Sequence, residues 1–341
     1  MESRRADRLA SARTNSIDGL TVTREGIVCA ASHDEMRRAR AQFDRCHYLR
    51  LPGLIEPHLL RVMERHLARE SFAYNSTRVG SDLVPAKGWV GVALHVPLND
   101  PQLFRPVRQL TGCGPIGCFG GRLYRLAARP GMELRWHNDL RDTRLVALTI
   151  NLSPQPYRGE MLQLRAVNQR GYEEIPNLDF GDAVLFRVSP RLKHRVTPIE
   201  GRIAKTAFAG WFAAKPGYRA VRKKFFDPAK LGNEARAGRN GEWLPLPGRS
   251  DAMQIPDDVV FQKSPDETFV MSFATSAAYG LDAVGGRIWE LLGAGLDLGA
   301  VADALASEYE AAPARVELDV RRLVGELAAR RLIRVARRKR T

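Results

Sequence analysis

The sequence lacks any run of apolar residues approaching the roughly 20 that a membrane-spanning helix needs. Its first residues, MESRRADRLASARTNSIDGL, contain arginines but no apolar stretch behind them, which argues against a secretory signal. Arg and Ser enrichment is typical of a transit peptide, but Glu2, Asp7 and Asp18 weaken that interpretation. We therefore expect a cytoplasmic protein without membrane contact and a disordered tail over residues 1–20.

Cysteine is also scarce, with 4 among 341 residues. Cys29, Cys46, Cys113 and Cys118 match no zinc-binding spacing. We expect them to be free and mostly buried thiols, which agrees with a cytoplasmic location.

Acidic residues are outnumbered, 38 against 53 Lys and Arg, which gives a net charge of +15. Such an excess invites a nucleic-acid-binding interpretation. Its distribution argues otherwise, because residues 251–329 contain 14 Asp and Glu against 5 Lys and Arg, a net charge of −9. Phosphate binding needs clustered positive charge on the domain that makes the contact. We therefore expect no nucleic-acid partner.

The hydrophobic pattern changes along the chain. Residues 42–70 contain an extended apolar piece, HYLRLPGLI, and then a helical one. From residue 119 onward, short extended runs such as GRLYRLAA, RLVALTINLS, DAVLFRV and KTAFAGWF alternate with turn residues. This pattern is typical of an all-β sandwich or barrel. Residues 214–250 are basic, rich in Gly and Pro and without steady periodicity, as in a linker.

The C-terminal segment has a different pattern. Three short strands are predicted, at DVVFQKS, TFVMSFA and AAYGLD, followed by helices over 283–294, 298–310 and 314–331. Strands and helices in separate runs indicate a small α+β domain. One apolar stripe runs along the third helix through Val316, Val320, Leu323, Val324 and Leu327.

The segment RWHNDL places His137 and Asp139 two positions apart at the start of a strand-like region. Residues i and i+2 of a strand point to the same side, so an imidazole and a carboxylate can face one point. A second histidine, His194, begins a later extended segment, HRVTPI. Two imidazoles and one carboxylate form the facial triad of non-haem Fe(II) sites, which leaves three coordination positions open. We therefore predict that His137, Asp139 and His194 are metal ligands and catalytic.

These segments together resemble the Fe(II)/2-oxoglutarate-dependent dioxygenases of the prolyl-hydroxylase type. The resemblance covers roughly residues 40–213 and rests on RPGMELRWHND, LVALTINLS, RGEMLQL, DFGDAVLF and HRVTPIEGRIAKTAFAGWF. It implies a mainly β jelly roll, or double-stranded β-helix, with flanking helices. It also implies Fe(II), 2-oxoglutarate as co-substrate and O2, with ascorbate as an optional reductant.

The resemblance further implies a basic residue on the last core strand that binds the distal carboxylate of 2-oxoglutarate. Lys205 is the candidate, with Arg202 as the alternative. A lysine departs from the commoner arginine and gives a less strict geometry, because it is a point charge. The tyrosine that often contacts the co-substrate is replaced by Ala128, so Tyr124 or Asn151 would substitute for it. Because Asp139 is present, hydroxylation is favoured over halogenation, with desaturation or cyclisation as alternatives.

Residues 251–336 resemble the PqqD family of peptide-recognition elements, a small winged-helix-like domain. The resemblance rests on AYGLDAVGGRIWELL, ADALASEYE and VELDVRRLVGELAARRLI. It implies that the leader of a ribosomally made precursor peptide adds as a strand beside the third strand and lies against the third helix. The residues expected to contact the peptide are Ala277, Tyr279, Leu281, Val320, Leu323 and Val324. Leu323 and Leu327 fit the core equally well.

The two resemblances together predict an oxygenase that hydroxylates, or otherwise oxidises, a residue of a precursor peptide recruited through its leader. One alternative is a hydroxylase of a free amino acid or small metabolite, with the C-terminal unit as a protein-docking module. Another is a non-catalytic binding protein. The predicted parts of the chain are a tail at 1–20, an oxygenase domain at 21–213, a linker at 214–250, a PqqD-like domain at 251–336 and a basic tail at 337–341.

Overall fold

The structure is a computed structural model. It describes residues 15–129, 132, 134–141, 143–225, 246–264, 267–275 and 277–336. The chain divides into two compact units, residues 1–223 and residues 224–341. The basic tail at 337–341, most of the predicted N-terminal tail and much of the predicted linker lie outside the described residues. No helix in the described part of the chain is long and apolar enough to cross a membrane.

The first unit is built on an 11-stranded antiparallel sheet, counted over the described residues. One half contains, in order, β6 (Cys118–Leu126), β15 (Lys205–Ala213), β8 (Arg144–Asn151), β12 (Ala183–Arg187) and β3 (Tyr48–Leu51). The other half contains β7 (Leu134–His137), β13 (Leu192–Val196), β10 (Leu162–Ala166) and β11 (Glu173–Ile175). β5 (Gly80–Pro85) pairs with both β6 and β7, and β4 (Phe72–Thr77) pairs with β5.

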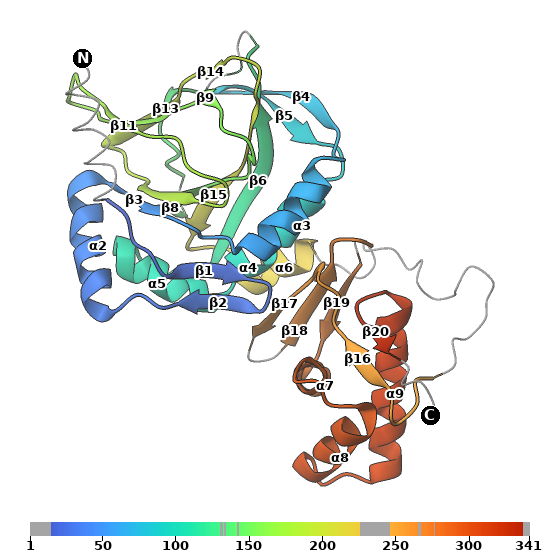
Figure 1. Cartoon of the computed structure of the whole chain (residues 1–341). Helices are drawn as coiled ribbons and strands as arrows, with labels where there is room; N and C mark the ends of the chain where they lie inside the picture. Colours follow the sequence, from blue (N-terminus) through green and yellow to red (C-terminus); the bar gives the residue numbers. More distant parts are fainter. Residues whose placement is uncertain are drawn as a thin grey trace. The chain divides into compact units, whose positions relative to one another are not determined.

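The sheet curls into a half-barrel around the space between its two halves (Figure 1), which confirms the predicted jelly roll. Side chains alternate along β15, as a strand requires. Lys205 and Trp211 share the face that looks into the half-barrel, whereas Phe208 and Phe212 lie on the opposite face. Phe208 and Phe212 pack against Phe119 of β6, with ring centroids 6.0 and 4.9 Å from its own, so this opposite face forms the apolar core.

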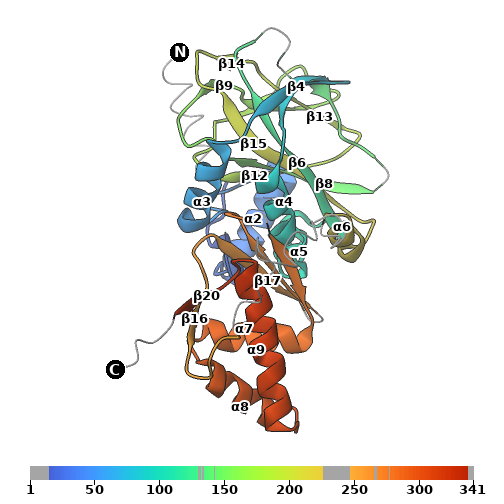
Figure 2. The same ribbon diagram turned by 90° about the vertical axis from the view of Figure 1, so that its right-hand side faces the viewer.

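Helices cover that apolar face of the sheet (Figures 1 and 2). They are α2 (His33–Cys46), α3 (Pro57–Leu67), α4 (Trp89–Leu98) and α5 (Pro101–Thr111). α4 packs on β6, and α2 packs on β3 and α5. Local sequence sets the helix ends: Ser32 and Glu35 form a capping box at the start of α2, and Asp100 caps α5 ahead of its first-turn proline.

Short elements complete the first unit. They are β1 (Leu20–Thr23) paired with β2 (Gly26–Cys29), and β9 (Arg158–Gly159) paired with β14 (Ile199–Glu200). The helix α6 (Tyr218–Phe225) begins in the first unit and ends just past its boundary. The helix α6 falls in the segment predicted as a linker. The segment before β1 is also more ordered than expected, because the backbone of Asn15 and Ile17 hydrogen-bonds to Arg50 of β3. Ile17 is buried there, so the predicted tail ends earlier than residue 20. All four cysteines are free, as predicted, but only Cys118 is buried.

The second unit follows its sequence pattern closely. β17 (Val259–Ser264), β18 (Glu267–Ser272) and β19 (Ala278–Leu281) form a three-stranded antiparallel sheet in that order. The helices α7 (Ala283–Gly293), α8 (Leu298–Glu308) and α9 (Pro313–Ala329) follow, around a core centred on the buried Trp289. A second, short pair of strands, β16 (Ala252–Gln254) and β20 (Arg334–Ala336), was not predicted.

Asn99, fully buried after α4, joins this helix to β6. Its Nδ2 donates to the carbonyl oxygens of His95 and Phe119, and its Oδ1 accepts from the Phe119 backbone N–H. Asn99→Ala would leave these groups unpaired in the core, so we expect the free energy of unfolding to fall by at least about 2 kcal/mol. Urea denaturation of the full chain measures this. The exposed Asn168→Ala is the control, and equal stability of the two variants would contradict the role.

Candidate functional site

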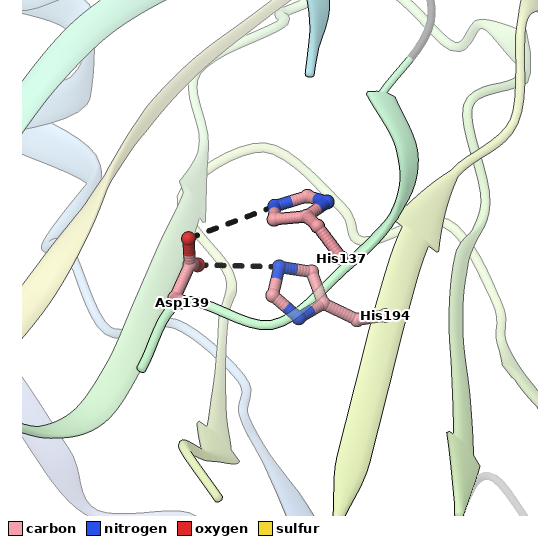
Figure 3. Close-up of side chains that lie close together, drawn as sticks. All are labelled: His137, Asp139 and His194. Carbon is pink, nitrogen blue, oxygen red and sulfur yellow. Dashed lines mark ion pairs between the residues drawn. The ribbon is translucent and has the colours of Figure 1, made fainter. Parts of the chain in front are cut away.

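Three side chains that could hold a metal ion converge between the two halves of the sheet (Figure 3). His137 ends β7 and His194 lies in β13, and these two residues are direct cross-strand partners. Their ring centroids are 4.2 Å apart. The Asp139 carboxylate faces both rings, with Oδ2 3.2 Å from His194 Nε2 and Oδ1 3.6 Å from His137 Nε2. The candidate ligand atoms of all three residues lie within 4.8 Å of one another.

The route by which these residues meet differs in one respect from the sequence argument. β7 ends at His137, so Asp139 belongs to the segment after the strand and not to the strand itself. Strand alternation therefore does not place the carboxylate. The turn after β7 brings it back toward the rings, and the register between β7 and β13 brings the two histidines together.

Hydrogen bonds orient His137 and Asp139. The Nδ1 atom of His137 lies 2.5 Å from the Arg135 carbonyl oxygen, so Nδ1 carries the proton and the Nε2 lone pair faces Asp139. Trp211 Nε1 donates to Asp139 Oδ2 over 2.9 Å. Arg144 stacks on the Trp211 ring and places its Nη1 3.5 Å from Asp139 Oδ1. The tautomer of His137 is thus set within β7 itself, whereas the position of the Asp139 carboxylate is set by residues of β15 and β8.

The ionisation of these groups suits metal ligands. Burial, together with the neighbouring His194, lowers the pKa of His137, so its imidazole is neutral near pH 7. Burial alone would raise the pKa of Asp139, but hydrogen bonds from His194 and Trp211 outweigh it and hold that pKa below its usual value. An ionised carboxylate and a neutral imidazole bind a cation without first losing a proton. The donor set, two nitrogens and one oxygen on one side of a cavity, fits non-haem Fe(II).

The three residues line a cavity of about 140 Å³. Lys205 and Tyr124, both predicted to contact the co-substrate, line the same cavity and are buried. The ammonium of Lys205 lies 3.2 Å from Glu160 Oε1 and 5.3 Å from the centre of the Tyr157 ring. Burial opposes the charge on Lys205, but the Glu160 carboxylate and the two tyrosines raise its pKa, so the lysine stays a cation.

Two predicted co-substrate residues lie elsewhere. Arg202 is exposed in the turn before β15 and does not line the cavity. Asn151 is buried at the end of β8, where its side chain donates to the Leu178 carbonyl and accepts from the Ser153 backbone N–H. Its amide stabilises a turn and does not line the cavity.

The sequence argument missed Trp211, Arg122 and Glu160. Trp211 could have been found from the sequence. It lies an even number of positions from Lys205 on β15, so the two side chains share one face of that strand. Arg122 has the same parity as Tyr124 on β6 and lines the cavity. Glu160 comes directly after β9, has a left-handed φ of 49° and points inward. No sequence periodicity predicts this direction of its side chain.

A separate groove lies in the second unit, with a volume of about 530 Å³. Its walls are β19, α7, the end of α8 and α9. Among the residues predicted to contact a peptide, Tyr279, Leu281, Val320 and Leu323 line it. Val324 does not: it is fully buried in the core because it lies on the inner side of the helical stripe. Ala277 lies just before β19 and outside the groove lining. β19 is an edge strand of its three-stranded sheet.

Comparisons with known proteins agree with both units. The 2OG-Fe(II) oxygenase superfamily model matches residues 122–213, and the coenzyme PQQ synthesis protein D (PqqD) model matches residues 267–333. No curated protein matches the sequence.

The similar solved structures each cover part of this chain. A 2OG-Fe(II) oxygenase family oxidoreductase from Burkholderia pseudomallei shares 13% identity over 55% of this chain and 94% of its own, with a TM-score of 0.40. A Pseudomonas putida prolyl-4-hydroxylase shares 18% sequence identity, and the alignment covers 53% of this chain and 100% of that protein, with a TM-score of 0.39. TbiB1, solved in complex with the TbiA(beta) leader peptide, shares 35% sequence identity. The alignment covers 25% of this chain and 99% of TbiB1, with a TM-score of 0.24. By the two family-model matches, the chain joins a domain of the 2OG-Fe(II) oxygenase superfamily to a C-terminal PqqD domain, as its sequence predicted.

Proposed function

We propose that the protein is a 2-oxoglutarate-dependent oxygenase that oxidises a residue of a ribosomally made precursor peptide. The observation that carries this proposal is the convergence of His137, Asp139 and His194 in one cavity that also contains the buried cation Lys205. In the proposal the first three hold Fe(II). Bound iron and 2-oxoglutarate supply O2 activation, coupled to oxidative decarboxylation of the co-substrate and hydroxylation of a C–H bond.

The chain's own residues prepare the site for this chemistry. His137 presents Nε2 because its Nδ1 is bonded to the Arg135 carbonyl, and Trp211 and Arg144 hold the carboxylate of Asp139 in place. In the proposal, these contacts orient the imidazole and the carboxylate toward the metal position, which would limit reorganisation on binding.

Lys205 is proposed to hold the far carboxylate of 2-oxoglutarate. It lines the cavity from β15, across from the histidine pair on β7 and β13, and its ammonium is buried. A charge-assisted hydrogen bond in such a site is stronger than one in water. Tyr124, on the neighbouring strand β6, lines the same part of the cavity and is proposed to contact the co-substrate as well.

The second unit is proposed to bind the leader of the precursor peptide. The edge strand β19 offers main-chain hydrogen bonds, and the groove beside it offers apolar contacts from Leu281, Val320 and Leu323. Asp282 and Asp319 also line the groove, which favours a leader segment without acidic side chains there. Because both units belong to one chain, leader binding raises the local concentration of the core peptide near the oxygenase unit.

The metal site is tested with His194→Ala and Asp139→Ala. Removal of a ligand should weaken Fe(II) binding by more than about 100-fold, since loss of a residue that merely orients a ligand already costs about 10–100-fold. Anaerobic titration calorimetry measures the affinity, and the exposed His33→Ala is the control. Fe(II)-loaded protein that never converts 2-oxoglutarate to succinate, even with precursor peptide, would contradict the enzymatic proposal.

The co-substrate role of Lys205 is tested against Arg202, which lies outside the cavity. Lys205→Ala should raise the dissociation constant for 2-oxoglutarate about 30-fold or more, because it removes one partner of a buried charged pair. Arg202→Ala should leave that constant unchanged. Titration of the metal-loaded protein with 2-oxoglutarate measures both, and the reverse result would assign the carboxylate to Arg202.

The leader groove is tested with two leucines of α9. Leu323 lines the groove, whereas Leu318 is 39% exposed and outside it. Leu323→Glu should weaken binding of a labelled leader peptide about tenfold or more, because it buries a charge in place of an apolar contact. Leu318→Glu should not. Fluorescence anisotropy with short peptides encoded beside the gene measures this.

The same pair of variants separates the proposed function from its alternative. If Leu323→Glu and wild type oxidise a full-length precursor equally, leader recruitment is wrong. The alternative, hydroxylation of a free amino acid or small metabolite with the second unit as a docking module, would then be favoured.

A further inference from the structure

The carboxylate of Glu160 lies behind Lys205 in the oxygenase unit. Its side chain has no exposed surface, and its Oε1 atom lies 3.2 Å from Lys205 Nζ. Neither carboxylate oxygen has a further hydrogen-bond partner among the described residues. A carboxylate accepts several hydrogen bonds in water, so this group is held almost entirely by one cation.

The backbone at Glu160 is strained to place that carboxylate. Its φ of 49° lies in the left-handed region, which costs a non-glycine residue about 1–3 kcal/mol. The backbone N–H of Glu160 is bonded to the Pro198 carbonyl oxygen over 2.9 Å, which holds the residue in this conformation. Strain of this kind persists where the surroundings demand it, and here it directs an acidic side chain inward to the cavity's lysine.

The cavity offers no spare positive charge for a dicarboxylate. Of the described residues that line it, Lys205 and Arg122 are its permanent cations. Lys205 is paired with Glu160, and Arg122 is paired with the fully buried carboxylate of Asp82. A metal dication at the triad would be balanced by Asp139 and by the carboxylate of 2-oxoglutarate that chelates the metal. The distal carboxylate would therefore add one uncompensated negative charge to a buried site, which is costly.

We infer that Glu160 controls co-substrate binding, and that 2-oxoglutarate binds with uptake of one proton by the Glu160 carboxylate. This inference rests on the proposed function. When the dianion binds beside the Lys205–Glu160 ion pair, the Glu160 carboxylate takes one proton from solvent. In the resulting complex, the Lys205 cation is paired with the distal carboxylate of 2-oxoglutarate, and Glu160 beside it is neutral. Affinity for 2-oxoglutarate therefore falls as the pH rises.

The groups around Glu160 agree with this direction. Burial raises the pKa of Glu160 to about 7 even with Lys205 beside it. Among the described residues, the other titratable groups that interact with it are Tyr157, before β9, and Tyr124 on β6. Their pKa values are both raised, so both are neutral near pH 7. Arg122 lies farther along β6 and is paired with Asp82. A second carboxylate near Lys205 raises the pKa of Glu160 further, so protonated Glu160 predominates in the complex.

The test uses full-length protein loaded with Mn(II), which permits binding without turnover. Calorimetric titration with 2-oxoglutarate at pH 7 and pH 8, in phosphate and in Tris, counts the protons taken up. We expect close to one proton per ligand at pH 8 and a dissociation constant that rises severalfold, at most about tenfold, between the two pH values. 2-Oxobutyrate, which lacks the distal carboxylate, should bind with no comparable proton uptake.

Glu160→Gln should abolish the proton uptake and bind 2-oxoglutarate several times more tightly than wild type at pH 8. Glu160→Gly removes the same carboxylate and suits the left-handed backbone, so it serves if the glutamine variant folds poorly. The control is Glu200→Gln, an exposed residue of β14 in the same small β9–β14 sheet.

The outcomes separate the two proposals. Proton uptake that persists in both Glu160 variants, or a wild-type affinity that does not change with pH, would overturn the role of Glu160 and leave the oxygenase proposal intact. Wild-type protein that binds Mn(II) but no 2-oxoglutarate at either pH would overturn the oxygenase proposal itself.

Discussion

The pairing of β7 with β13 is the constraint on which the candidate metal centre depends. It sets His137 directly opposite His194, and residues so opposed share one face of a sheet. A slip of one residue would turn one imidazole to the other face. The ladder is in turn fixed by the rest of the half-barrel, because β13 also pairs with β10 and β7 pairs with β5. The 4.2 Å separation of the two histidine rings therefore depends on the pairing of the whole sheet.

Around that pair, the half-barrel keeps its charged groups in compensated pairs. Asp139 is held by a residue of β15 and by one at the start of β8. The partner of Lys205 lies in the turn before β10, and the partner of Arg122 lies on β5. The Lys205–Glu160 and Arg122–Asp82 pairs join residues far apart in the sequence, so no single segment contains the charges that meet at the cavity. Charges arranged in this way are sensitive to an added ligand, since any new anion must displace a partner, recruit a cation or change an ionisation state.

The cavities of the two units differ in size and in lining. The oxygenase unit has a small cavity of about 140 Å³, whereas the groove of the second unit is larger, about 530 Å³, and lined mostly by apolar side chains. A large apolar groove beside an edge strand suits recognition of an extended segment. A small cavity with a few charged and histidine side chains in its wall suits positioning of one reactive group. In the proposed function, affinity for the peptide therefore comes from one unit and the chemistry from the other.

Much of the secondary structure follows from local sequence. β6, β8, β12 and β15 coincide with runs of alternating or apolar residues bounded by turns, and the helices of the second unit follow their predicted ranges closely. Such patterns arise from backbone periodicity, which needs no knowledge of distant contacts. The identity of the metal-binding candidates also followed from residue type, because few combinations other than two histidines and one carboxylate suit a facial site.

Tertiary structure decided what periodicity leaves open. The stripe on α9 contains both Val324 and Leu323, but only packing determined that the first enters the core and the second lines the groove. Glu160 gave no signal, because a left-handed residue after a turn points where the surrounding strands allow. Sequence by itself determined which residues have the chemistry for a site and which face of a strand or helix they share. Only the folded sheet decided which of them meet, because register and turns join segments that no local period connects.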